Sequence, residues 1–439
     1  MRFTTLDEWL QWLECQHPRA IDLGLERVSV VAKALNIALA MPVITVAGTN
    51  GKGSCVALSS AILSAEGYRV GTYTSPHLVH YNERIGIAGR YVSDDELLAA
   101  FSAIDEARGA TSLTYFEFGT LAALWLFQRA ELDVVILEVG LGGRLDAVNI
   151  VDADIAIVSS IAIDHEAWLG SDREVIGREK AGVFRQGRIA VVGDLNPPQS
   201  VLNYGRDIGA TVLCRDRDFS YSESTSQWQW QWQGLDAQGD KLEYHGLPLP
   251  SVLLDNAATV LQALQYLDLN VSDAAVRSGL SRVELSGRCQ HIVLDGVDIV
   301  LDVAHNPAAV VTLRQHLQQY PVSGRSRCVF AVMADKAIAE MVSILQPWFE
   351  SWWLADLDGN SRAAGASDVS GMLMIQQVSG VQYGGSVAAS IQQAMAQSAS
   401  GDRIVVFGSF FTVAEAMLFL SERGGVDVKS VITAKGNTL

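Results

Sequence analysis

The chain has few cysteines, no long apolar run and little positive charge. Its five cysteines, Cys15, Cys55, Cys214, Cys289 and Cys328, lie far apart and form no C-x-x-C pair. We therefore expect reduced thiols, with neither a disulfide framework nor a zinc site. No apolar stretch approaches the ~20 residues that span a membrane. The N-terminus carries acidic residues early and lacks the apolar centre of a signal peptide, so the expected location is the cytoplasm.

The shortage of positive charge limits the partners that the chain can bind. Lys and Arg number 32 against 49 Asp and Glu, which gives a formal net charge of −17. A general nucleic-acid-binding protein needs a basic face, and so does a protein held on anionic lipid. We therefore expect no nucleic acid and no membrane as partners. The expected partners are small-molecule substrates, and the chain is expected to be a monomer. An anionic substrate would need a local cluster of Lys, Arg and backbone N–H groups.

The pattern of apolar residues predicts an α/β fold. Short apolar runs at residues 42–47, 69–74, 133–139, 153–160 and 188–193 predict strands, and amphipathic runs between them predict helices. Continuous apolar strands are typical of a sheet covered on both faces. Strand–helix alternation favours a mostly parallel sheet with right-handed crossovers.

Two segments stand apart from this alternation. Residues 227–233 read QWQWQWQ, which places Trp228, Trp230 and Trp232 on one face of a strand. A hairpin packing that face on the domain is favoured over a cofactor-stacking platform, with residues 241–245 as the second strand.

A second series of predicted strands and helices begins near residue 286. A hairpin follows, then three more strand–helix units with strands near residues 327–333, 351–355 and 403–407. The 439 residues allow two or three domains at about 150 residues each. We expect an N-terminal domain over residues 1–285 and a smaller, Rossmann-like α/β domain over residues 286–439.

Residues 46–54 read VAGTNGKGS and carry the strongest local signal. They follow a predicted buried strand and open a helix, the context that a phosphate-binding loop requires. Glycines let backbone N–H groups face phosphate oxygens, and Lys52 would place its charge on the β- and γ-phosphates. Gly53 separates Lys52 from Ser54, unlike the common P-loop spacing. An ordinary Gly-rich turn is the alternative.

Other polar residues follow predicted strands or lie on a charged helix. Ser75, Glu138 and His165 come after three strands, whose carboxyl ends meet at one edge of a parallel sheet. They could converge on one cation, although imidazole is an unusual magnesium ligand. Lys180 lies in a charged helical segment, where a solvated face is the default interpretation. Residues 302–307 could form an anion site or a simple helix cap.

Together these segments resemble the folylpolyglutamate synthase and dihydrofolate synthase family, a branch of the Mur ligases. The residues 114–117, TYFE, look most like the bifunctional bacterial enzymes, which act on both dihydropteroate and folates. Cys289 departs from the family's usual aromatic residue. The resemblance covers nearly the whole chain and includes residues 22–28, 48–54, 74–78, 83–85, 114–117, 140–147, 164–165, 177–182, 256–258, 287–288 and 302–307.

The resemblance implies roles for individual residues. The ATP contacts would be Thr49, Asn50, Gly51, Lys52, Gly53, Ser54, Asn256, Arg288, Asp302 and His305. Two Mg²⁺ ions would be held by Ser75, Glu138, His165 and a carbamylated Lys180. The pterin pocket would be lined by Asp22, Leu23, Gly24, Leu25, Thr114, Tyr115, Phe116, Glu117, Leu145, Asp146 and Ala147. Lys52, His165 and Lys180 would be catalytic.

The implied activity is an ATP-dependent ligation. L-glutamate would be joined to dihydropteroate and to reduced folates through an acyl phosphate, with release of ADP and phosphate. Three alternatives stay open: a Mur-type cell-wall ligase, a folylpolyglutamate synthase without dihydrofolate synthase activity, and a nucleotide-gated binding protein or ATPase.

Overall fold

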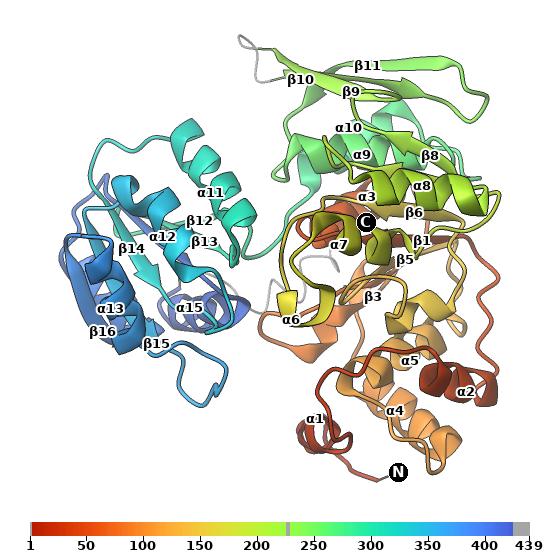
Figure 1. Cartoon of the computed structure of the whole chain (residues 1–439), viewed down its shortest axis with the longest axis horizontal. Coiled ribbons are helices and arrows are strands. Elements are labelled where there is room, and N and C mark those ends of the chain that lie inside the picture. The colour runs from red at the N-terminus through yellow and green to blue at the C-terminus, as the bar shows by residue number, and fades with distance from the viewer. Residues whose placement is uncertain (1, 225–228, 425–439) are drawn as a thin grey trace. The chain divides into compact units, whose positions relative to one another are not determined.

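The computed structural model describes residues 2–224 and 229–424, which fall into two compact units. The first unit comprises residues 2–77 and 81–284, and the second comprises residues 78–80 and 285–424, apart from the residues not described. Figure 1 traces the chain through both units. No helix among the described residues is long and apolar enough to cross a membrane.

The first unit is built on an eight-stranded sheet with the strand order β4-β3-β2-β5-β1-β6-β7-β8. The strands from β2 to β8 in this order are parallel, whereas β3 and β4 add antiparallel pairs at one edge. The strands are β1 (Val43–Ala47), β2 (Val70–Tyr73), β3 (Ile85–Ile87), β4 (Arg90–Tyr91), β5 (Val134–Glu138), β6 (Ile155–Val158), β7 (Ile189–Val192) and β8 (Thr211–Cys214).

Both faces of this sheet are covered, as the continuous apolar strands predict. In β5, Val134 and Ile136 join one apolar core, while Val135 and Leu137 join the other. Helices α3 (Lys52–Glu66), α9 (Leu254–Leu264) and α10 (Asp273–Arg282) pack on the first core. The second core is covered by α1 (Leu6–Cys15), α2 (Glu26–Ala34), α4 (Asp94–Arg108), α5 (Tyr115–Phe127), α7 (Arg173–Ala181) and α8 (Gln199–Ile208), while α6 (Glu166–Leu169) is a single turn.

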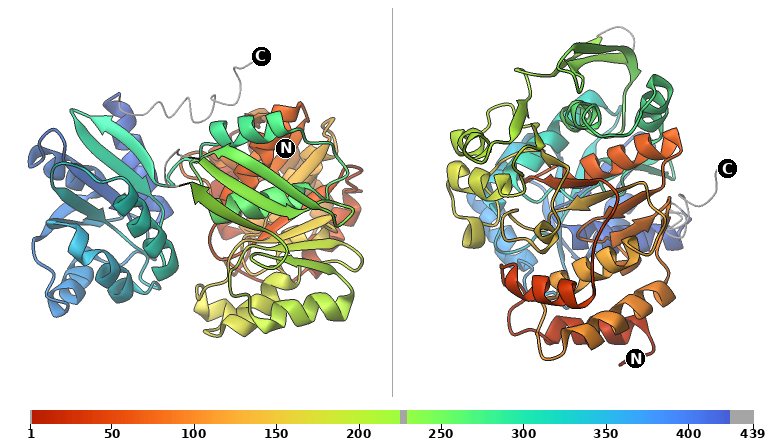
Figure 2. Two further views of the ribbon diagram at one scale, coloured as in Figure 1. Left: turned by 90° about the horizontal axis from the view of Figure 1, so that it is seen from above. Right: turned by 90° about the vertical axis from the view of Figure 1, so that its right-hand side faces the viewer.

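The predicted tryptophan hairpin is confirmed within the described residues. Strands β9 (Ser220–Ser224), β10 (Gln229–Leu235) and β11 (Lys241–Pro248) form an antiparallel sheet over α9 and α10 (Figure 2). Trp230 and Trp232 are buried, and Trp232 Nε1 donates to the Ala258 carbonyl oxygen at 3.1 Å. Trp228 lies outside the described residues. These tryptophans are core residues of the hairpin.

The second unit is a six-stranded sheet with the strand order β12-β13-β17-β14-β15-β16, parallel except for β12. The sequence prediction lacked β16 and its two flanking helices. The strand was missed because VQYGGS is an edge strand with little apolar content. The elements are β12 (Gln290–Leu294), β13 (Val297–Asp302), α11 (Pro307–Gln319), β14 (Ser326–Phe330), α12 (Ile338–Leu345), β15 (Ser351–Asp356), α13 (Ala366–Ile375), β16 (Val381–Ser386), α14 (Val387–Ala396), β17 (Arg403–Phe407) and α15 (Phe410–Glu422).

Helix α3 crosses α10 at a glycine, which gives a test of the packing. A Cβ atom at Gly279 would lie 2.5 Å from Ile62 Cγ1 and 2.6 Å from Ile62 Cα, whereas one at Gly371 in α13 would meet nothing within 4 Å. Gly279→Ala should therefore lower the free energy of unfolding by about 1–3 kcal/mol. Gly371→Ala should raise it by up to about 1 kcal/mol, because alanine is the better helix former. Thermal unfolding compares the two, and an unchanged Gly279→Ala would contradict the close crossing.

Candidate functional site

Four neighbouring strands of the first unit deliver polar residues to one edge of the sheet. β2, β5, β1 and β6 are adjacent and parallel, so their carboxyl ends lie together. Ser75 follows β2, Glu138 ends β5, and the glycine-rich loop follows β1. The Ser75 N–H donates to Glu138 Oε2 at 3.2 Å, so these two predicted residues are in contact.

The glycine-rich loop is braced by residues that follow β6. The Thr49 N–H donates to the Ser160 carbonyl oxygen at 2.7 Å, and the Asn50 carbonyl oxygen accepts from Ser159 Oγ at 2.7 Å. Gly51 has φ +87° and a Cβ there would lie 2.5 Å from Asn256 Oδ1 on α9. The predicted nucleotide residue Asn256 therefore lies directly against the loop.

The start of α3 gives this loop the properties of an anion site. The helix begins at Lys52, two residues before the predicted start at Ser54, and its first N–H groups have no acceptor within the helix. Lys52 Nζ donates to the carbonyl oxygens of Gly48 at 3.1 Å and Thr49 at 3.2 Å. The ammonium group therefore lies over the loop, where phosphate charge would be bound.

Glu138 is a buried carboxylate beside the same helix end. Its side chain is 5% exposed, and a Cβ at Gly53 would lie 3.7 Å from its Oε2 atom. The positive end of a helix dipole stabilises negative charge at such a position. An ionised carboxylate next to a phosphate loop is suited to share a divalent cation with phosphate oxygens.

Lys180 is buried, so the default interpretation of a solvated charged face is wrong for this residue. It is 4% exposed near the end of α7. Burial first, and the Lys52 ammonium second, lower the pKa of Lys180 to about 7, against the opposing effect of Asp164 and Asp146. Near neutral pH a large fraction of this amine is therefore uncharged and nucleophilic.

His165 occupies a strained position at the start of a single helical turn. Its φ is +54°, and its backbone N–H donates to Asp164 Oδ1 at 2.8 Å. In residues 2–224 and 229–424, no three His, Cys, Asp or Glu side chains are grouped so as to hold a metal ion. The predicted metal set contains only Glu138 and His165 of these types and needs the Ser75 hydroxyl and a carbamate as well. That set stays a prediction.

The three segments predicted to line the pterin pocket lie together. The Gly24 N–H donates to the Leu145 carbonyl oxygen at 3.3 Å. Arg27 pairs with Asp22 at 2.9 Å and with Glu117 at 3.0 Å. Sequence reasoning gave Arg27 no role, although it lies in the quoted segment 22–28. Leu23 and Leu25 flank Gly24, and Ala147 follows Asp146 at a helical turn.

Within these segments, several predicted ligand residues also stabilise the local backbone through a helix cap, hydrogen bonds or close packing. Glu117 and Thr114 form a capping box at the start of α5, with Glu117 Oε2 accepting from the Thr114 N–H at 2.7 Å. Tyr115 is the first residue of that helix, and the Phe116 ring lies over Gly140, where a Cβ would be 2.7 Å from Phe116 Cζ. Burial raises the pKa of Asp146 to about 7, opposed by N–H donors such as that of Leu141 at 2.8 Å and by Lys52.

The second unit groups the other three predicted nucleotide residues. Asp302 accepts from the Cys289 N–H at 2.8 Å and the Ala304 N–H at 2.7 Å. The Arg288 guanidinium carbon lies 5.3 Å from the centre of the Phe410 ring, and the His305 ring centre lies 6.1 Å from it. Phe410 therefore links Arg288 and His305 and was missed in the sequence.

Comparisons with known proteins cover nearly the whole chain. Residues 287–410 match the family described as Mur ligase, glutamate ligase domain. The dihydrofolate synthase/folylpolyglutamate synthase of Escherichia coli (strain K12) is 45% identical over 419 residues, which is 95% of this chain and 96% of that protein.

Two solved structures extend the likeness to three dimensions. Escherichia coli FolC in complex with DHPP and ADP has a TM-score of 0.90 and 44% identity, and covers 96% of this chain and 99% of that one. A bifunctional folylpolyglutamate synthase/dihydrofolate synthase with Mn, AMPPNP and L-glutamate bound has a TM-score of 0.88 and 46% identity, with coverage of 95% and 98%.

The placement of Lys52 predicts a specific loss on substitution. Lys52→Gln removes the positive charge over the loop, so ATP turnover should fall by about a hundredfold or more while the fold is retained. Lys33→Gln, at an exposed lysine of α2, is the matched control and should keep full turnover. Steady-state phosphate release checks both variants. Near-normal turnover by folded Lys52→Gln would remove the loop from the chemistry.

Proposed function

The chain belongs to the dihydrofolate synthase/folylpolyglutamate synthase family, and we propose that it joins L-glutamate both to dihydropteroate and to reduced folates, using ATP. The observation that carries this proposal is the grouping of the three pterin segments beside a phosphate loop in one unit. The Gly24–Leu145 and Arg27–Glu117 contacts make that grouping. The relatives with bound DHPP, ADP, AMPPNP and L-glutamate supply the matching ligand classes.

The proposed reaction proceeds in two steps. The substrate carboxylate attacks the γ-phosphorus of ATP, which forms an acyl phosphate and releases ADP. The amine of glutamate then attacks the acyl carbon, forms the amide and releases phosphate with one proton. Three anionic reactants must approach one another in a chain whose net charge is −17. Lys52 and the N–H groups at the start of α3 would offset the phosphate charge and stabilise the transferring phosphoryl group.

The two parts of the chain would share these tasks. Residues 1–285 would bind ATP and the pterin, and residues 286–439 would form the glutamate-ligase domain. The ATP phosphates would be contacted by Lys52 together with Thr49, Asn50, Gly51, Gly53 and Ser54. From the second part, Arg288, Asp302 and His305 would contact the nucleotide.

A divalent metal would complete the phosphate site, and the residues present suit a hard cation. Glu138 supplies a buried carboxylate at the start of α3, and the Ser75 hydroxyl, His165 and a carbamate on Lys180 would be the other ligands. We expect this set to hold two Mg²⁺ ions, which would neutralise phosphate charge. The neutral Lys180 amine would add to the carbon of CO₂ and lose one proton, which gives an anionic carbamate.

The Mur-type cell-wall alternative is less well supported. Cell-wall ligases have no need of a pterin pocket, and the contacts of Gly24 with Leu145 and of Arg27 with Asp22 and Glu117 support such a pocket here. A folylpolyglutamate synthase without dihydrofolate synthase activity differs only in its acceptor, so an assay must compare acceptors.

We expect glutamate-dependent phosphate release with dihydropteroate and with tetrahydrofolate, and mutual competition between them. Phe116→Ala should raise the KM for dihydropteroate by about tenfold, because it removes the ring over Gly140. Trp125→Ala, at the other end of α5 where Arg129 stacks on the ring at 3.8 Å, is the control. Release with tetrahydrofolate alone would limit the chain to folate extension. Release with neither acceptor would rule out the ligase.

A further inference from the structure

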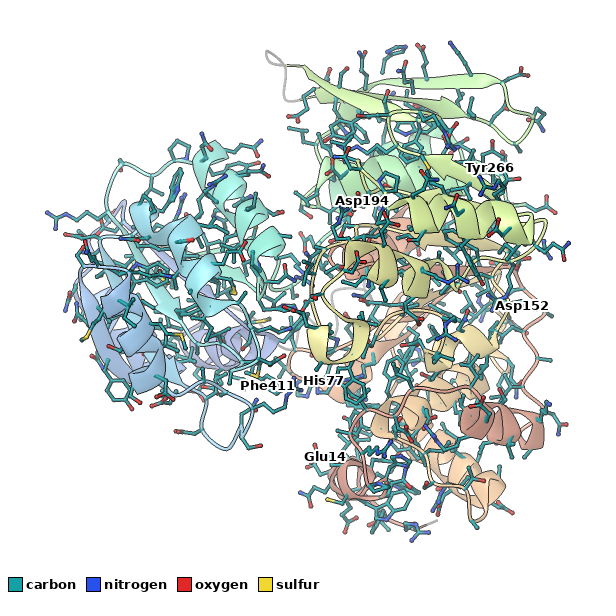
Figure 3. All side chains as sticks on the ribbon, in the orientation of Figure 1. Glu14, His77, Asp152, Asp194, Tyr266 and Phe411 are labelled. Carbon is teal, nitrogen blue, oxygen red and sulfur yellow. The ribbon has the colours of Figure 1, made fainter. Side chains whose placement is uncertain are left out.

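A buried arginine without a carboxylate partner lies in the first unit. Arg84 ends the 3-10 turn Tyr81–Arg84, directly before β3, and is 8% exposed. Its Nε atom lies 2.8 Å from His77 Nδ1, to which it donates; His77 is labelled in Figure 3. Within the described residues Arg84 forms no ion pair, and no other side-chain hydrogen bond.

Two tyrosine rings lie against the Arg84 guanidinium. Its central carbon lies 5.3 Å from the centre of the Tyr81 ring and 5.5 Å from that of Tyr115. The two rings meet edge to face at 5.6 Å. Burial raises the pKa of Tyr81 to about 12 and also raises the pKa of Tyr115, so both phenols stay neutral. The rings attract the positive charge through their faces but do not neutralise it.

Arg84 lies between the candidate phosphate edge and the pterin segments. Its carbonyl oxygen accepts from the Thr74 N–H at 2.9 Å, one residue before Ser75. On the other side Tyr115 precedes Phe116 in α5, and the Phe116 ring lies 5.9 Å from the Tyr73 ring. A substrate with its pterin near Phe116 and its reacting carboxylate near Ser75 would pass this guanidinium.

Burying a guanidinium without a counter-ion is unfavourable, so its retention calls for a ligand that supplies one. The planar fork of arginine matches a carboxylate through two parallel hydrogen bonds. We propose that Arg84 binds the carboxylate of the pterin substrate and holds it for phosphorylation. This inference rests on the proposed function, because it names the residue that would bind the carboxylate of the pterin acceptor in that reaction. Arg84 Nε donates to His77. The two Nη atoms would therefore bind and orient the substrate carboxylate.

The test separates recognition of the carboxylate from recognition of the ring. Pteroate and its methyl ester share the pterin and the aromatic ring but differ in charge. Their binding is measured by titration calorimetry without nucleotide or divalent metal, so that no metal ion can hold the carboxylate. The unmodified chain should bind the acid at least about tenfold more tightly than the ester, as expected for a charge-assisted bidentate contact.

Substitution of Arg84 should abolish that preference. Arg84→Gln should lower the affinity for the acid by about tenfold and leave the affinity for the ester within about twofold of its original value. Arg90→Gln is the matched control, because Arg90 lies on the next strand, is exposed and pairs with Glu96 at 2.7 Å. It should leave both affinities unchanged. Arg84→Lys keeps the charge without the fork and should give an intermediate preference.

Equal binding of acid and ester by the unmodified chain would overturn the role of Arg84, even if Arg84→Gln fails to fold. A preference that survives in Arg84→Gln, or an equal loss of both ligands, would also overturn it. If neither ligand binds the unmodified chain and no glutamate-dependent phosphate release occurs, the proposed function itself is wrong.

Discussion

The candidate site depends on the burial of Lys180 near the Lys52 ammonium group, because burial first and that charge second disfavour a proton on Lys180. Lys52 Nζ donates hydrogen bonds to the carbonyl oxygens of Gly48 and Thr49, which hold the ammonium group over the loop. Lys180 is 4% exposed, and its burial together with the Lys52 charge lowers its pKa to about 7. Under the proposed function, carbamylation then reverses the sign at Lys180 and turns repulsion into attraction for Lys52 and for metal ions.

The fold supplies the positions that this chemistry needs. Because β2, β5, β1 and β6 are adjacent and parallel, residues far apart in the chain share one sheet edge. The loop before α3 keeps its shape through Ser159, Ser160 and Asn256, which contact it from outside. A chain with an overall negative charge thereby obtains a small positive region at the start of one helix. Arg84 adds a buried cation next to the pterin segments.

The parts of this arrangement that depend on local sequence pattern could be predicted from the sequence. Buried strands read as apolar runs, and the loop at residues 48–54 is recognisable because its glycines and lysine are contiguous. Long-range contacts left no such signal. Arg27 and Glu117 are 90 positions apart, and the burial of Lys180 depends on packing between α7 and the loop at Gly143. Strand β16 was missed because an edge strand needs few apolar residues.

The direct test of the account is the chemical state of Lys180. Protein incubated with ¹³C-labelled bicarbonate, Mg²⁺ and an ATP analogue is examined by ¹³C NMR. The account predicts one carbamate resonance that is absent in Lys180→Arg, is retained in Lys33→Arg, and fades as the pH falls below about 7, where the amine is protonated. Absence of that resonance in the folded, unmodified chain at pH 8 would contradict the account, as would its persistence in Lys180→Arg.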